Sequence, residues 1–156
     1  LKRLMHRDPD PLRALLDRLA ELVSDYLLAQ IEAGAQGVQL FDTWAGLLSR
    51  ADYAAFVLPW HQRIAARLAE ADAPLILYVN NCAHLVDFMA DSGAAVISLD
   101  WRCDLAAAAA QVGDRVSLQG NLDPCALAAP PCTSTIPGRP GSSGRTQDSR
   151  MIGRRR

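Results

Sequence analysis

The stretch PLILYVNNCAHLVDFMADSGAAVISLDWRCDLAAAAAQVGDRVSLQ, residues 74–119, alternates short apolar runs with helical segments. The runs 74–79, 94–99 and 116–119 predict buried strands, and 83–93 and 104–113 predict the helices between them. Continuous apolar strands alternating with helices are typical of a parallel sheet whose faces are covered. The strands recur about every 20 residues, close to the shortest βα repeat, which favours a (β/α)8 barrel. Periodicity alone does not exclude an open, doubly wound sheet.

A long amphipathic helix is predicted upstream of this stretch. Asp10 followed by Pro11 is a suitable N-cap and first-turn pair, and apolar residues recur at helical spacing until Gly34. The segment GVQLF, residues 37–41, then has the length and composition of a buried strand.

A second helical segment separates this strand from the next. Ser49 with Asp52 resembles a capping box at its start, and Pro59 should kink or divide it. Together with the stretch 74–119, these segments predict an α/β protein: a partial (β/α)8 TIM barrel of about four βα units. In such a barrel we expect Val38, Leu40 and Leu118 to point inward and to fill the interior.

The last part of the chain differs in composition. From Ala129 to Arg156 apolar periodicity vanishes, Pro, Gly, Ser and Arg dominate, and Asp148 is the only acidic residue. We therefore expect residues 1–128 to form the partial barrel and residues 129–156 a disordered tail. A basic arm that binds nucleic acid is the alternative, which the lack of interleaved aromatic residues disfavours. An out-of-frame reading of GC-rich coding sequence would also give this composition.

The overall composition describes a globular chain. It has 156 residues, 50% of them hydrophobic, and a net charge of −1, so we expect one domain and no nucleic-acid partner. No apolar run approaches the roughly 20 residues of a membrane helix, and the polar start does not resemble a signal peptide. These features predict a cytoplasmic protein with no membrane partner.

The cysteines show no CxxC spacing, although the chain has four of them. We therefore expect reduced, mostly buried thiols and no metal site. His84 lies near Cys82, but two such residues without further ligands are a weak metal signal, and a histidine at a helix start is the simpler interpretation.

Each predicted strand ends in polar or aromatic residues. The carboxyl ends of parallel strands meet at one edge, where sites of this architecture lie, so these clusters should share one rim. Taken singly, each cluster could cap a helix or form a turn; together they indicate a site. The residues are Asp42, Thr43 and Trp44; Asn80, Asn81 and Cys82; Asp100, Trp101 and Arg102; Gly120, Asn121 and Asp123.

Three strings around these clusters resemble the C-terminal half of the uroporphyrinogen decarboxylase family: AGAQGVQLFDTWAGLLS, VISLDWRCDL and LQGNLDPCAL. The match runs from about Leu12 to Leu127 and keeps the order and spacing of the strings. The resemblance implies a cytoplasmic, homodimeric (β/α)8-barrel enzyme of haem biosynthesis. Such a carboxy-lyase removes the carboxyl groups of the four acetate side chains of uroporphyrinogen III, gives coproporphyrinogen III and needs no cofactor.

The resemblance assigns one substrate-binding residue here. Thr43 stands where the family usually has a substrate-contacting serine, in FDSWAG or a similar string, and it keeps the hydroxyl. The family's arginine-rich segment, cleft aspartate and tyrosine precede the equivalent of Leu1, and its late histidine follows the equivalent of Leu127. We therefore expect no catalytic residue in this chain and no turnover by it alone, as for a truncated or frameshifted product.

Weaker substrate-binding candidates lie on the same rim. Asp42 could contact substrate or fix its own loop. Arg102 could bind a substrate carboxylate through bidentate hydrogen bonds, although a surface ion pair with Asp104 or another carboxylate is the simpler expectation. Asn121 and Asp123 are expected to shape the loop that precedes a helix beginning at Pro124.

Two further functions stay open at this stage. Relatives on the same barrel are zinc-dependent methyltransferases of thiols or corrinoids, with a His-x-Cys metal pair where this chain has Tyr78, Val79 and Asn80. Phenol and amide groups are poor substitutes for imidazole and thiolate at zinc. The other alternative is a non-enzymatic remnant, because half a barrel exposes two strand edges and an apolar strip.

Overall fold

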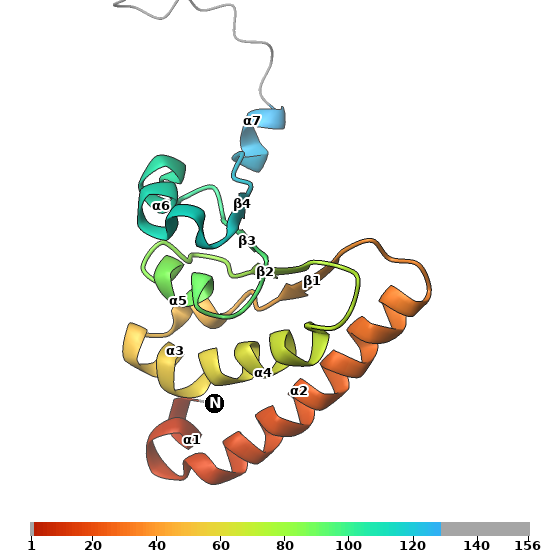
Figure 1. Cartoon of the computed structure of the whole chain (residues 1–156). Helices are drawn as coiled ribbons and strands as arrows, with labels where there is room; N and C mark the ends of the chain where they lie inside the picture. The colour runs from red at the N-terminus through yellow and green to blue at the C-terminus, as the bar shows by residue number, and fades with distance from the viewer. Residues whose placement is uncertain (1, 129–156) are drawn as a thin grey trace, which may run out of the picture.

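The computed structural model describes residues 2–128, which fold into helices around one parallel four-stranded sheet (Figure 1). The strands are β1 (Val38–Phe41), β2 (Leu75–Tyr78), β3 (Val96–Ser98) and β4 (Ser117–Gln119), and they pair in the order β1-β2-β3-β4. A doubly wound sheet reverses its strand order at a switch point, whereas successive neighbours in one direction are the order of a barrel. The predicted partial barrel is confirmed for these residues.

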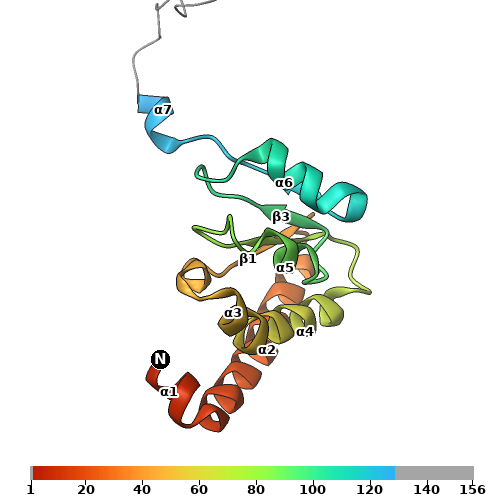
Figure 2. The ribbon, with the colours of Figure 1, turned by 90° about the vertical axis from the view of Figure 1, so that its left-hand side faces the viewer.

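Helices connect the strands and pack on the sheet. Figures 1 and 2 show α2, α3 and α4 beside β1 and β2, while α5 and α6 follow β2 and β3. The helices are α1 (Lys2–Arg7), α2 (Pro9–Glu32), α3 (Arg50–Phe56), α4 (Leu58–Leu68), α5 (Val86–Ala90), α6 (Leu105–Val112) and α7 (Pro124–Ala128), with 3-10 turns η1 (Ala45–Leu47) and η2 (Gly113–Arg115).

One face of the sheet forms the core with the helices. Leu40, Leu77, Ile97 and Leu118 are partners in register across the four strands, and Leu77 and Ile97 are 1% and 0% exposed. Val38 belongs to the same core. A barrel interior filled by Val38, Leu40 and Leu118 is therefore a wrong expectation, because alternation places these residues on the helix-covered face.

The opposite face is concave. Gln119 Nε2 on β4 donates to Ser98 Oγ on β3 at 3.2 Å and to Gln39 Oε1 on β1 at 3.5 Å. Neighbouring strands lie about 4.8 Å apart, so β1 and β4 would be about 14 Å apart in a flat sheet. The two glutamines meet because the sheet curls, as it does in a barrel wall.

The helix boundaries follow local sequence signals, with one displaced start. α2 begins at Pro9 with Asp8 as N-cap, two residues before the predicted Asp10–Pro11 pair, which lies in the first turn. The short helix α1 was not predicted. Gly34 ends the α2 region as expected, at φ +104°, a conformation that favours glycine.

The division of the second helical segment is confirmed. Ser49 Oγ accepts a hydrogen bond from the Asp52 backbone N–H and caps α3. The helix breaks at Val57, and Pro59 lies in the first turn of α4, where its missing N–H costs nothing.

Residues 129–156, predicted to be a disordered tail, lie outside the residues that the structure describes. Cys132 lies among them, so its predicted state as a reduced thiol also stays a prediction. Within residues 2–128, no helix combines the length and apolar character that crossing a bilayer requires.

Candidate functional site at the strand ends

The polar clusters predicted to share a rim follow the carboxyl ends of the four strands. Asp42 comes directly after β1, and its backbone N–H donates to the Tyr78 carbonyl at the end of β2, at 2.9 Å. Thr43 and Trp44 follow and are exposed, Trp44 by 73%. The Thr43 hydroxyl therefore lies on the accessible surface of the rim.

Arg102 connects the ends of β2 and β3. Its Nη1 donates to Asn80 Oδ1 at 3.3 Å and lies 3.6 Å from Asp100 Oδ1, and its guanidinium lies over the Trp101 ring at 4.5 Å. The expected ion pair with a carboxylate is confirmed, with Asp100 as the partner. Asp104 Oδ1 instead accepts from the Ala107 N–H and caps α6. The Arg102 side chain is 46% exposed, which leaves guanidinium donors free for an anion.

Asp100 organises the loops after β2 and β3. Its side chain is buried, and Oδ2 accepts from the Cys82 N–H at 3.1 Å while Oδ1 accepts from the Arg102 N–H at 2.8 Å. A buried carboxylate needs such donors, because its desolvation would otherwise be costly. The Asp100 carboxylate therefore fixes the backbone of the loop after β2 at Cys82 and of the loop after β3 at Arg102.

Asn121 fixes the loop after β3 from the end of β4. Its Nδ2 donates to the carbonyl oxygens of Asp100 and Cys103 at 3.1 and 2.6 Å. Asp123 Oδ1 accepts from the Cys125 N–H at 2.9 Å, and Pro124 begins α7. These contacts agree with the loop-building roles predicted for Asn121 and Asp123, and Asn121 stays a weaker substrate-binding candidate.

Asp42 is held from the helix side by a pair that sequence reasoning missed. His61 is buried on α4, its Nε2 lies 3.1 Å from Asp42 Oδ2, and its Nδ1 lies 3.1 Å from the Tyr53 hydroxyl. A carboxylate only accepts and a neutral imidazole donates from one nitrogen, so Tyr53 donates to His61 and His61 donates to Asp42. Burial, followed by the Asp42 charge, raises the pKa of Tyr53 and keeps its hydroxyl protonated.

The sequence contains a signal for this Tyr53–His61–Asp42 hydrogen-bond chain, called the relay below. His61, Ile64, Ala65 and Leu68 recur at helical spacing, and all four are buried in α4. A histidine among the apolar residues of a core-facing helix needs a polar partner. Asp42, directly after the predicted strand 37–41, was an available partner.

The loops after β1 and β2 are pressed together. A Cβ on Gly46 would lie 1.9 Å from the Asn80 carbonyl oxygen, so only glycine fits there. Asn81 Nδ2 reaches the Gly46 carbonyl at 3.5 Å. This contact fixes Thr43 and Asn80 relative to one another through their loops.

A hollow of about 260 Å³ lies beside Asp42 and His61, on the helix side of β1. It is lined mainly by apolar residues of α2, β1 and α4, such as Leu16, Leu40 and Ile64. This hollow offers few polar groups to orient a ligand, whereas polar side chains gather at the rim. The concave face and its rim are therefore the better candidate site.

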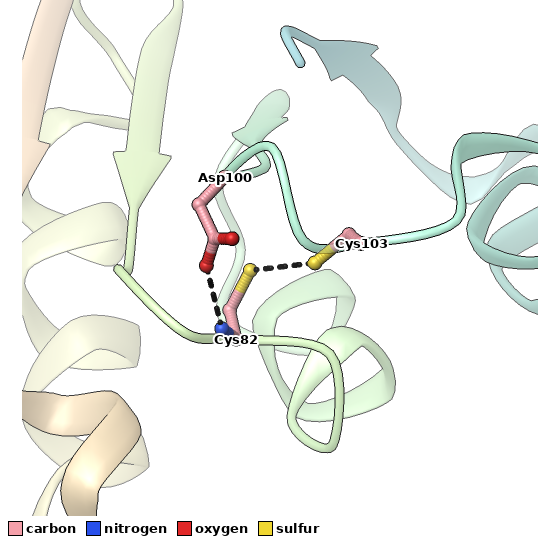
Figure 3. Close-up of side chains that lie close together, drawn as sticks. All are labelled: Cys82, Asp100 and Cys103. Atoms are coloured by element: carbon pink, nitrogen blue, oxygen red, sulfur yellow. Dashed lines mark hydrogen bonds between the residues drawn. The ribbon is translucent and has the colours of Figure 1, made fainter. Parts of the chain in front are cut away.

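The cysteines show one unforeseen arrangement. Cys82 and Cys103 are free and buried as predicted, and with Asp100 they offer three metal-ligand atoms within 4.8 Å of one another (Figure 3). Cys125 is exposed, so two of the three cysteines within residues 2–128 are buried, in agreement with the expectation of mostly buried thiols. His84 is not in this cluster; its Nε2 lies 2.9 Å from the Leu48 carbonyl, so it fixes a loop.

Comparisons of the chain with a family profile and with individual proteins agree with each other. The profile of the family described as Uroporphyrinogen decarboxylase (URO-D) matches residues 1–133. The chain is similar to proteins named uroporphyrinogen decarboxylase from Gloeobacter violaceus, with 47% identity over 129 residues, and Hahella chejuensis, with 49% over 135 residues. These alignments cover 81% and 84% of this chain but only 37% and 38% of the relatives. The chain spans less than two fifths of the length of these relatives.

Proposed function

The chain belongs to the uroporphyrinogen decarboxylase family, and from that premise we propose that its four strands form one wall of an enzyme that converts uroporphyrinogen III to coproporphyrinogen III. The observation that supports this most is the family match over residues 1–133, which includes all four strand ends and the rim. The second support is the curled parallel sheet, whose concave face is half of what a closed barrel would enclose.

The substrate is a tetrapyrrole with acetate and propionate side chains, so its site needs hydrogen-bond donors for carboxylates. In our proposal the Thr43 hydroxyl donates to one substrate carboxylate from the loop after β1. Arg102, which Asn80 and Asp100 orient, supplies a guanidinium for another. Asp42 is the weaker candidate, because His61 already holds one of its oxygens.

The reaction breaks the bond between the acetate carboxyl carbon and its methylene carbon. Protonation of the pyrrole ring first provides a sink for the electron pair of that bond, so CO2 leaves without a free carbanion. Loss of the ring proton and protonation of the former methylene carbon then give a methyl group. The pyrrole itself acts as the electron sink, and the proposal therefore assigns no cofactor.

We extend the proposal to the surroundings of the enzyme. The whole protein would act as a homodimer in the cytoplasm, with residues 1–128 as part of its barrel. The 156-residue chain alone should show no turnover. Among the described rim residues Arg102 is the one permanent cation. A single cation is not enough to bind a substrate with many carboxylates.

A chimera tests the function. Residues 1–128 would replace the matching segment of the Hahella chejuensis relative, and the product would be followed by chromatography after incubation with uroporphyrinogen under reducing conditions. We expect the chimera to form coproporphyrinogen, and the 156-residue chain alone to form none.

Two outcomes would contradict the proposal. A chimera that folds and has the relative's oligomeric state but forms no product would show that this segment no longer supports decarboxylation. Turnover by the isolated chain at the rate of the relative would show that four strands hold the complete catalytic machinery.

A further inference from the structure

Two cysteines from different loops meet beneath the rim. Cys82 follows β2 and Cys103 follows β3, and their sulfur atoms lie 3.4 Å apart in the core. Cys82 is 0% exposed and Cys103 7% exposed. In Figure 3 the carboxyl group of Asp100 lies on the other side of Cys82, above its backbone nitrogen.

Hydrogen bonds of the backbone, Asp100 and Asn121 hold this arrangement, and the two thiols are in hydrogen-bond contact with each other. Asp100 binds the backbone N–H of Cys82, and the Cys103 N–H donates to the Asp100 carbonyl at 3.1 Å. Asn121 fixes the Cys103 carbonyl from the other side. The loops therefore present both sulfur atoms at a set separation before any ligand arrives.

That separation suits a thiophilic metal ion. Zinc binds thiolate at about 2.3 Å with tetrahedral angles, which places two sulfur ligands about 3.8 Å apart. The observed distance of 3.4 Å between the sulfur atoms is slightly shorter, and a small rotation of either cysteine side chain would remove the difference. Asp100 Oδ2 accepts from the Cys82 N–H and Oδ1 from the Arg102 N–H, and each oxygen keeps a second lone pair for a metal.

The charges are also suitable. A divalent cation would displace the protons of both thiols. Two thiolates and one carboxylate would then surround the cation, and the Arg102 guanidinium beside Asp100 would balance the remaining negative charge.

We propose that Cys82, Cys103 and Asp100 form a binding site for a thiophilic divalent cation such as zinc, which joins the loops after β2 and β3. The three protein ligands leave one tetrahedral position for water. The site is separate from Thr43 on the rim and does not depend on the proposed decarboxylation. Its effect would be structural, because the ion would cross-link the loops after β2 and β3, which otherwise meet through hydrogen bonds and packing in the core.

Cadmium titration of the reduced 156-residue chain tests the site, with Cys125 and Cys132 both replaced by serine. Thiolate-to-cadmium charge transfer should appear in the ultraviolet and saturate at one ion per chain. Cys82→Ser and Cys103→Ser should each abolish the two-thiolate signal. Asp100→Asn should keep the two-thiolate signal but weaken affinity at least tenfold, because a neutral amide replaces a charged oxygen ligand.

A thermal readout complements the titration. Zinc should raise the unfolding temperature of the chimera described above and leave that of its Cys82→Ser/Cys103→Ser variant unchanged, because a ligand of the native state stabilises it. No signal with thiols shown to be reduced, or a signal that survives Cys82→Ser, would overturn the proposal. A pair that forms a disulfide in air but binds no cadmium when reduced would be a redox site instead, and would equally overturn it.

Discussion

The two faces of the sheet differ in what their residues contact. On the helix-covered face, Leu77 and Ile97 are almost fully buried within one apolar core. On the concave face, Gln39, Ser98 and Gln119 hydrogen bond across strands, and the Phe41 ring, 66% exposed, meets Tyr78 edge to face. The helix-covered face stabilises the fold by burial. The concave face has polar and aromatic groups suited to contact with a ligand or with the rest of a barrel.

This contrast locates stability and function on opposite sides of the same strands. Because side chains alternate along a strand, neighbouring positions such as Ile97 and Ser98 serve different purposes. Substitutions on the helix-covered face should therefore lower the free energy of unfolding, and substitutions on the concave face or rim should change activity more than stability.

The largest effect is expected on the helix-covered face. Ile97→Ala should lower the free energy of unfolding of the chimera by about 2–5 kcal/mol, because it leaves a cavity in a closed core. Gln39→Ala on the concave face is the matched control and should cost about 1 kcal/mol or less. Urea unfolding would measure both. Equal losses would mean that the two faces do not differ as described.

The next effect is on catalysis. Thr43→Val in the chimera should lower the decarboxylation rate roughly tenfold to a hundredfold, equivalent to a lost hydrogen bond of about 1.5–3 kcal/mol to a charged group. Thr43→Ser keeps the hydroxyl and should retain the rate. Thr43 is exposed, so unfolding should be unaffected in either variant. An unchanged rate and KM in Thr43→Val would make the hydroxyl a bystander.

The relay behind Asp42 should affect stability less than the core does. His61→Phe removes both hydrogen bonds of the buried imidazole and leaves the Tyr53 hydroxyl without its partner, which should cost about 1–3 kcal/mol. His84→Phe is the control, since His84 is exposed and makes one hydrogen bond to a backbone carbonyl. A loss for His84→Phe that matches the loss for His61→Phe would contradict a special role for the relay.

The smallest effect concerns a surface pair on the helix side. Arg50, whose Nη1 lies 2.7 Å from Asp87 Oδ1, lowers the pKa of that carboxyl below its ordinary value. The stabilisation is full above the unfolded pKa of about 3.9 and is lost as pH falls through the lower folded pKa. The pair is partly exposed, so it should contribute about 1 kcal/mol at most.

Comparing parent and Asp87→Asn by urea unfolding from neutral to acidic pH measures this contribution. The difference in free energy of unfolding should shrink as pH falls below about 4. A difference that grows on acidification would have the wrong sign for a depressed carboxyl pKa.

The sequence predicted the architecture because its strands are apolar and regularly spaced. It placed β1 to β4 to within two residues at each end, and it placed Ser49 as the cap of α3. It failed at the start of α2, because two Asp-Pro pairs follow one another and either satisfies the capping rule. It also assigned Val38, Leu40 and Leu118 to the wrong face, because a continuous apolar run does not show which side faces the helices.

The site was predictable only in part. The rim followed from strand order, and the loop-building role of Asn121 followed from its position before Pro124. The Cys82–Cys103 contact joins residues from two different loops, so no spacing rule reveals it. The link between His61 and Asp42 likewise depends on how α4 packs against β1.

The central claim is that the concave face is one wall of a closed barrel and needs a cover. Within residues 2–128, β1 and β4 each pair on one side only, and apolar side chains such as Phe41 and Trp44 are exposed. Unpaired strand edges and exposed apolar groups favour association.

Size-exclusion chromatography with light scattering and thermal unfolding of the 156-residue chain tests this claim most directly. The account predicts concentration-dependent self-association or aggregation, and a broad unfolding transition. A compact monomer that unfolds in one sharp, cooperative transition would contradict it, and would indicate a small α/β domain that is stable by itself.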